Sequence, residues 1–165
     1  MTSETRIDPV IAEFVEGLRE VYGGRLMTVA LFGSRARGDQ RPGSDVDLLV
    51  IADGMPPSYT DRLAEIRALI DRTNRELARV APADPPPCLS VVLKDRAEGA
   101  FHAPLYLDLT EDARLLVDRD GFFAGILTDV RARMAELGSR RIWLGQDRWY
   151  WDLKPDSRPG EVIEI

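Results

Sequence analysis

The sequence predicts a mixed α/β fold in which helices cover a small β-sheet. Short runs of apolar, β-forming residues alternate along the chain with longer segments in which apolar residues recur every three or four positions. Glycine and proline separate these segments. The 165 residues, 44% hydrophobic and 30% charged, suit a single domain with a sizeable buried core. We therefore expect one domain over residues 1–165.

Residues 8–93 carry the patterns expected of the core of this domain. Helical spacing and short apolar runs predict helices at 8–22 and 58–80 and strands at 26–32, 46–51 and 88–93. Asp8 is the candidate N-cap of the first helix, with Pro9 at the first helical position. The proline-rich residues 81–87 end the second helix, because proline lacks the amide donor that a helix needs.

Residues 94–165 predict a helical and β-hairpin C-terminal extension. The patterns indicate a short helix after Asp95, helices at 104–112 and 121–137, a strand at 114–117, a hairpin of strands at 141–144 and 149–153, and a final strand at 162–165. A polar turn containing Gly145, Gln146 and Asp147 is expected between the hairpin strands. Trp149 and Trp151 alternate as one face of a hairpin packed on the core would require, and the same aromatic and arginine-rich segment also suits stacking on a base or binding a partner.

Charge, apolar patterning and cysteine content exclude several classes of protein. The net charge of −6 argues against a broad, non-specific nucleic-acid surface. The apolar runs are far shorter than the roughly 18 to 20 residues that cross a bilayer, and the N-terminus lacks a secretory pattern, so we expect a cytoplasmic protein without membrane association. The single cysteine, Cys88, excludes an internal disulfide and a cysteine-rich zinc site, and we expect its thiol in the core.

A pair of carboxylates stands at the start of the second predicted strand. Because side chains alternate across a strand, Asp45 and Asp47 are expected on one face and Val46 on the other. Two neighbouring carboxylates repel each other unless a bound cation neutralises them. Their oxygen ligands suit Mg²⁺ or Mn²⁺ rather than a soft metal.

A glycine-containing turn follows the first predicted strand. Gly33 allows a backbone to approach a phosphate closely, and the Ser34 hydroxyl can donate a hydrogen bond to a phosphate oxygen. Arg35 and Arg37 place positive charge beside them. If the two consecutive strands are neighbours, this turn and the carboxylate pair meet at one end of the sheet, where a metal-bridged triphosphate would fit.

Together, the residues Gly33-Ser34-Arg35-Ala36-Arg37-Gly38 and Ser44-Asp45-Val46-Asp47-Leu48 resemble the signature of the nucleotidyltransferase superfamily with the DNA polymerase β-like fold. The sequences of these two motifs are similar to those of the minimal, antitoxin-type nucleotidyltransferases of prokaryotes. The resemblance implies a polymerase β-like core and catalytic, metal-binding roles for Asp45 and Asp47. It also implies ATP or another nucleoside triphosphate bound by Gly33, Ser34, Arg35, Arg37 and Ser44.

The chain departs from this family pattern in its third carboxylate. The family places an acid on a later strand, whereas the matching position here is Ser90. Asp84, Asp95 or Asp108 would have to supply the acid. With such an acid the resemblance implies transfer of a nucleoside monophosphate to a hydroxyl of a protein, an RNA or a small molecule. Without it, the chain would be a nucleotide-binding or partner-binding module.

The resemblance also bears on partners. Minimal members of the family often pair with a separate helical protein in toxin–antitoxin systems. We therefore expect any such partner of this chain to be a separate polypeptide.

Overall fold

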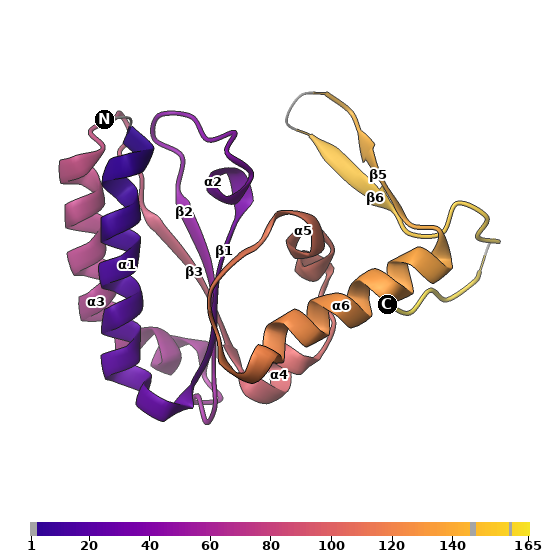
Figure 1. Cartoon of the computed structure of the whole chain (residues 1–165), viewed down its shortest axis with the longest axis horizontal. Coiled ribbons are helices and arrows are strands. Elements are labelled where there is room, and N and C mark those ends of the chain that lie inside the picture. The colour runs from indigo at the N-terminus through magenta and orange to yellow at the C-terminus, as the bar shows by residue number, and fades with distance from the viewer. Residues whose placement is uncertain (1–2, 146–147, 159) are drawn as a thin grey trace.

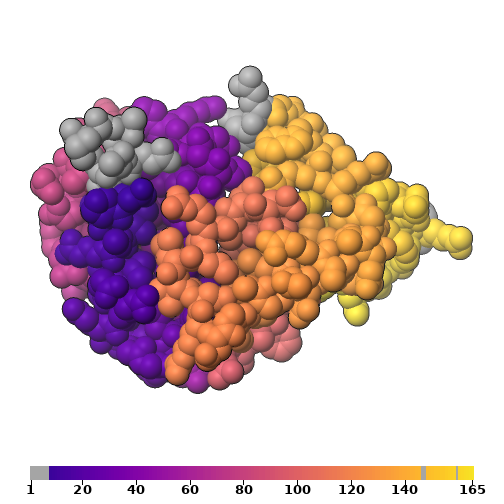
Figure 2. All heavy atoms as spheres, in the orientation of Figure 1, coloured from indigo at the N-terminus to yellow at the C-terminus, as the bar shows by residue number. Residues whose placement is uncertain are grey.

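The computed structural model describes residues 3–145, 148–158 and 160–165. Helices cover both faces of one sheet, and a separate β-hairpin lies beyond the end of the last long helix (Figure 1). In the space-filling view the C-terminal segment, in yellow, projects from a rounded body formed by the preceding residues (Figure 2). The predicted mixed α/β fold is confirmed.

Four strands form the sheet in the order β3-β2-β1-β4. Their bounds are Leu26–Phe32 for β1, Val46–Ala52 for β2, Leu89–Asp95 for β3 and Arg114–Asp118 for β4. The central strand β1 runs antiparallel to both β2 and β4, whereas β2 and β3 are parallel. Because β1 and β2 are covered on both faces, their sequences are nearly continuous apolar runs rather than alternating ones.

Helices α1 (Ser3–Tyr22) and α3 (Tyr59–Val80) pack together on one face of the sheet, and the short turn η1 (Gly23–Arg25) follows α1. Ser58 caps α3 by accepting a hydrogen bond from the amide of Asp61. The predicted start of the first helix at Asp8 is wrong, because α1 begins at Ser3 and Pro9 lies within it. A proline this close to a helix start removes only one intrahelical hydrogen bond.

The opposite face is covered by α4 (Arg96–Ala100), α5 (Pro104–Asp112) and α6 (Phe122–Leu137), with the turn η2 (Arg119–Gly121) before α6. The rings of Tyr106 and Phe123 meet edge to face at 5.0 Å in the middle of this second core. All three helices lie close to their predicted positions. The sheet strand β4 comes from the same part of the chain.

The hairpin strands β5 (Arg140–Trp143) and β6 (Trp149–Asp152) form a two-stranded sheet of their own. Of the predicted turn between them, Gln146 and Asp147 lie outside the described residues. The predicted final strand at 162–165 is wrong, because these residues pair with no strand of the described chain. Ile165 instead packs against the second core, whereas Val162 is 84% exposed.

Within the described ranges, no helix combines the length and the apolar character that crossing a bilayer requires.

Candidate nucleotide-binding site

The antiparallel pairing of β1 and β2 brings the glycine turn and the carboxylate pair to one end of the sheet. Phe32, the last residue of β1, lies opposite Asp47, the second residue of β2. Gly33 and Ser34 follow Phe32 directly, so they begin beside Asp47. The juxtaposition expected from two neighbouring strands is therefore present.

Gly33 is in contact with the carboxylate of Asp47. Its φ of +72° lies in the left-handed region, and a Cβ added there would lie 2.4 Å from Oδ2 of Asp47. Any side chain at this position would strain the backbone and displace the carboxylate. The sequence indicated a close approach at Gly33, and the group that approaches in the structure is Asp47.

The turn after β1 forms the five-residue helix α2 (Gly33–Arg37). It ends at Gly38, which adopts the left-handed conformation and donates its amide to the carbonyl of Ser34 at 2.9 Å. Ser34 is half-buried in this turn. The hydroxyl of Ser34 and the side chain of Arg37 are thereby carried at opposite ends of one rigid turn.

Arg35 is buried and fixes the segment that precedes β2. Its Nε donates to the carbonyl of Asp45 at 3.0 Å, and its Nη2 donates to the carbonyl of Ser44. The hydroxyl of Ser44 accepts a hydrogen bond from the amide of Arg41 at 2.9 Å. Two of the five predicted nucleotide-binding residues, Arg35 and Ser44, therefore have partners inside the protein that shape the loop.

Asp45 is exposed at the start of β2 and is held by Cys88. Its Oδ1 accepts hydrogen bonds from the amide of Cys88 at 3.0 Å and from the thiol at 3.1 Å. This hydrogen bond to Asp45, followed by burial and by the negative charges of Asp45 and Asp47, raises the pKa of Cys88 to about 11. The expectation that Cys88 is a core residue is wrong. Its thiol is exposed, because it lies at the open end of the sheet rather than between the layers.

Asp47 is half-buried between β1 and β3. Its neighbour in the parallel register is Ser90. Burial raises the pKa of Asp47, the hydrogen bond from Ser90 opposes that rise, and the charge of Asp45 adds to it. Arg35 and Arg37 lower the pKa of Asp47 by their positive charge. The two carboxylates therefore repel each other in a partly desolvated place, where a cation would be stabilised.

Two of the three candidate third carboxylates have other roles. Asp95 lies opposite Ala52 at the far end of β3, about five residues or ~16 Å along the strand from Ser90. It caps α4 there and accepts a hydrogen bond from the amide of Met55 at 2.9 Å. Asp108 accepts hydrogen bonds from Trp149 and Trp151 of the hairpin.

The third candidate, Asp84, is exposed in the proline-rich linker that precedes β3. Throughout residues 3–145, 148–158 and 160–165, no three histidine, cysteine, aspartate or glutamate side chains gather in an arrangement that could hold a metal ion. Asp45 and Asp47 therefore stand as a pair, with Ser90 as the polar neighbour of Asp47.

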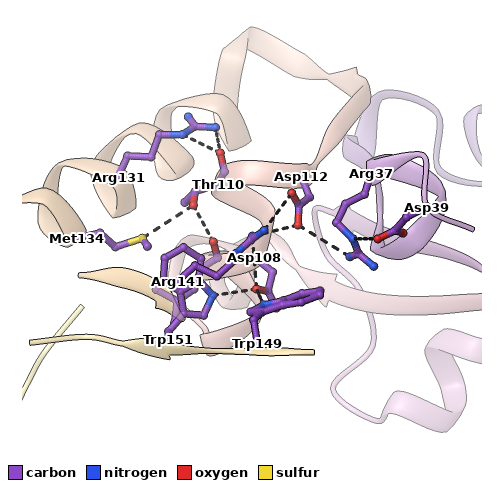
Figure 3. A network of polar contacts seen from close by, with 11 residues as sticks. Arg37, Asp39, Asp108, Thr110, Asp112, Arg131, Met134, Arg141, Trp149 and Trp151 are labelled. Atoms are coloured by element: carbon purple, nitrogen blue, oxygen red, sulfur yellow. Dashed lines mark hydrogen bonds and ion pairs between the residues drawn. The ribbon is translucent and has the colours of Figure 1, made fainter. Parts of the chain in front are cut away.

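Arg37 links the site to the C-terminal hairpin (Figure 3). Its Nε pairs with Oδ2 of Asp39 at 3.0 Å, its Nη1 lies 3.9 Å from Asp112, and its guanidinium lies 4.7 Å from the centroid of the Trp149 ring. Asp112 also accepts from Arg141 of β5 at 3.0 Å. Sequence reasoning did not place Asp112 or Arg141 near the site, because more than 70 residues separate each of them from Arg37 and no local pattern joins them.

The fold and this site define the class of protein. A family model of the nucleotidyltransferase domain matches residues 11–98, which is more than half of the chain and includes both the α2 turn and the carboxylate pair. The chain belongs to the nucleotidyltransferase domain family, a class of enzymes. The family resemblance seen in the sequence is confirmed.

Two similar proteins come from Methanocaldococcus jannaschii. The one provisionally named protein adenylyltransferase MJ1305 is 28% identical over 129 residues, which span 78% of this chain and 83% of that protein. The one provisionally named protein adenylyltransferase MJ0604 is 46% identical over 46 residues, which span 28% of this chain and 46% of that protein.

Solved structures show a looser likeness. A provisionally described nucleotidyltransferase from Sulfolobus solfataricus is 24% identical, with 72% of this chain and 86% of that chain covered and a TM-score of 0.46. A chain in the Shewanella oneidensis complex of a tri-AMPylated HEPN toxin with an MNT antitoxin is 15% identical, with 80% of this chain and 92% of that chain covered and a TM-score of 0.48.

Proposed function

We propose that this protein transfers an AMP group from ATP to a hydroxyl group of a protein acceptor. The observation that carries the proposal is the pairing of Phe32 with Asp47, which brings the α2 turn to the carboxylate pair at one end of the sheet. The name of the relative that aligns with 78% of this chain, a protein adenylyltransferase, supports the choice of the adenylyl group and of a protein acceptor.

In this proposal Asp45 and Asp47 hold a divalent cation, Mg²⁺ or Mn²⁺. The residues fit such an ion, because both donors are carboxylates and their mutual repulsion, with the burial that raises the pKa of Asp47, favours a positive charge between them. Mg²⁺ is commonly held by one or two carboxylates together with substrate phosphates. When bound, the cation supplies positive charge to the triphosphate and to the leaving pyrophosphate.

The α2 turn holds the triphosphate tail in this proposal. The Ser34 hydroxyl donates to a phosphate oxygen, and Arg37 neutralises charge on the β and γ phosphates. Gly33 allows the Asp47 carboxylate to lie directly against the start of this turn, so the cation and the phosphates would be held side by side. Arg35 and Ser44 contribute by holding the backbone before β2, so that Asp45 keeps its place.

The reaction is an in-line displacement at the α-phosphorus. An oxygen of the acceptor forms a bond to the α-phosphorus while the bond from that phosphorus to the oxygen bridging to the β-phosphate breaks. Pyrophosphate leaves, and the proton of the acceptor hydroxyl passes to solvent. The protein contributes to this step by holding the attacking and leaving oxygens in line and by stabilising the negative charge that develops on the phosphate.

A second candidate function is a nucleotide-binding or partner-binding module with weak or absent catalysis. One observation favours it: among the residues that the structure describes, the neighbour of Asp47 on β3 is Ser90 and no third carboxylate joins the pair. Serine can bind a water molecule beside the site, but it has no useful pKa as a base. Measured transfer therefore decides between the two candidates.

The acceptor that we propose is a separate helical polypeptide of the toxin–antitoxin kind. An RNA acceptor would have to dock against a protein whose net charge is −6, which disfavours a large phosphate-binding surface. Both acceptors belong in the same assay.

The test is label transfer from α-labelled nucleoside triphosphates with Mg²⁺, in the presence of candidate acceptor proteins or RNA. We expect label from ATP on a protein, its loss with EDTA, and its loss in the double variant Asp45→Asn with Asp47→Asn. Asp53→Asn is the matched control, because Asp53 directly follows β2 at the other end of the strand and pairs only loosely with Arg96 at 3.9 Å. Nucleotide binding without transfer would favour the module, and neither binding nor transfer would overturn both.

A further inference from the structure

We propose that the C-terminal hairpin positions Arg37 for the triphosphate tail, and that Trp149 and Asp112 thereby make the site select triphosphates over monophosphates. The inference rests on the proposed function of the α2 turn. It assigns a role to a segment that lies outside the matched residues 11–98. Trp149 and Asp112 are positioning residues in this proposal, because they act through Arg37.

The first argument is the way in which Arg37 is held. Three different parts of the chain contact its guanidinium: Asp39 in the loop after α2, Asp112 at the end of α5, and the ring of Trp149 in β6. The Arg37 side chain is only 18% exposed as a result. A long and flexible side chain loses much conformational freedom when it binds a ligand, so holding it in advance lowers the cost of binding.

The second argument is that Trp149 is itself fixed in place. Its Nε1 donates to Oδ1 of Asp108 at 2.8 Å, and Trp151 donates to the same oxygen at the same distance (Figure 3). The guanidinium of Arg141 also lies over the Trp149 ring, 5.0 Å from its centroid. A ring held by a hydrogen bond and between charged neighbours offers Arg37 a rigid surface for a cation–π contact.

The third argument separates this role from simple packing. Trp151 and Leu153 pack against the second core and so anchor the hairpin to the body of the protein. Trp149 and Trp151 both lie against the guanidinium of Arg141, and the contact with Arg37 is made by Trp149. Both tryptophans bond to Asp108, and Trp149 in addition contacts Arg37, so Trp149 can be altered while Trp151 still anchors the hairpin.

The selectivity follows from where Arg37 lies. Gly33, at the start of α2, contacts Asp47, whereas Arg37 ends the same turn and faces the hairpin. We assign Arg37 to the β and γ phosphates, which a monophosphate lacks. Displacing Arg37 should therefore weaken the binding of ATP and leave the binding of AMP unchanged.

The experiment measures the dissociation constants of ATP and AMP with Mg²⁺ by calorimetry, for Trp149→Ala, Trp149→Phe and Asp112→Asn. Tyr150→Ala is the matched control, because Tyr150 is the next residue of β6, alternates to the other face and is 50% exposed. We expect Trp149→Ala and Asp112→Asn to weaken ATP binding by about threefold to tenfold, the range of a partly desolvated cation–π or ionic contact. AMP binding should not change, and Trp149→Phe, which keeps a ring, should restore most of the ATP affinity.

A double-mutant cycle tests whether the effect passes through Arg37. With Arg37→Ala already present, Trp149→Ala should weaken ATP binding no further. An equal loss in both backgrounds, an equal loss for AMP, or an equal loss in Tyr150→Ala would overturn the inference. If Trp149→Ala fails to fold, Asp112→Asn and Trp149→Phe are measured by the same criteria. A wild-type protein that binds neither ATP nor AMP would overturn the proposed function. If the wild type transfers AMP and Trp149→Ala binds ATP as tightly as the wild type, the inference alone would be overturned.

Discussion

The Cα of Gly33 and the carboxylate of Asp47 lie so close that a Cβ on the glycine would be 2.4 Å from Oδ2 of the aspartate. One residue belongs to the turn assigned to phosphates, and the other belongs to the pair assigned to a cation. Because the two residues are in contact, a displacement of one moves the other. The first prediction concerns this contact.

Gly33→Ala should destabilise the fold and impair nucleotide transfer. The left-handed backbone and the displaced carboxylate together should cost about 1–3 kcal/mol of unfolding free energy. A shift of Asp47 by an ångström could lower transfer by about a hundredfold. Chemical denaturation and the label-transfer assay measure the two effects. Gly125→Ala is the control: it lies inside α6 with open space around it, so we expect unchanged or slightly increased stability.

Arg35→Lys should behave as a loss rather than as a conservative change. The guanidinium of Arg35 donates hydrogen bonds to two carbonyl groups, those of Ser44 and Asp45. The ammonium group of lysine cannot reproduce this planar, two-pronged arrangement of donors. We expect a loss of about 1.5–3 kcal/mol of stability, together with weaker Mg²⁺-dependent nucleotide binding. Full retention of both in the lysine variant would show that Arg35 acts as a positive charge alone.

The ionisation of Glu98 should make the stability of the fold depend on pH in the acid range. The hydrogen bonds from Arg62 lower the pKa of Glu98 from its usual 4.5 to about 2. A carboxyl whose pKa is lowered in the folded state adds stability above its unfolded pKa, so this stability is present above about pH 4.5 and is lost as the pH falls towards 2. Because the Glu98 side chain is 49% exposed, solvent screening reduces the contribution of its pair with Arg62 to the free energy of unfolding to about 1 kcal/mol.

The measurement for Glu98 is the midpoint of thermal unfolding of Glu98→Gln and wild type as a function of pH. The variant should be less stable at neutral pH, and the difference should shrink below pH 4.5. Glu76→Gln removes an exposed pair with Arg79 and should show a much smaller difference. A pH-independent difference for Glu98→Gln would contradict the prediction.

The thiol of Cys88 reports on Asp45. Its pKa of about 11 should make it react slowly with iodoacetamide although it is exposed, because the thiolate is the reactive form. Asp45→Asn removes the largest cause of that raised pKa and should speed alkylation at mildly alkaline pH by about tenfold or more. The chain has a single cysteine, so mass spectrometry reads this site directly. Asp53→Asn should leave the rate unchanged.

The sequence predicted the elements whose signals are local. The strand ends, the helix over residues 58–80 and the spacing between Gly33 and Asp47 depend on periodicity and turn chemistry over a few residues. The meeting of the α2 turn with Asp47 was also predictable, because it requires only that two consecutive strands be neighbours.

The remaining features depend on contacts between distant residues. Pattern alone treats Arg35 and Arg37 alike, since each is an arginine on the same turn. The fold buries Arg35 against the loop before β2 and directs Arg37 to the hairpin. Composition alone predicts Cys88 in the core, because cysteines usually lie there, but its place at the open end of β3 follows from the strand register.

The pairing of Asp47 with Ser90 has a thermodynamic consequence for the proposed reaction. A third acid at Ser90 would add a like charge beside the pair and so increase the repulsion that a bound cation relieves. With serine in that position, the described residues of the protein offer the ion two carboxylates. The phosphates of the nucleotide, together with water, would provide the remaining ligands. Cation and nucleotide should therefore bind as a cooperative unit, each raising the affinity of the site for the other by the same factor.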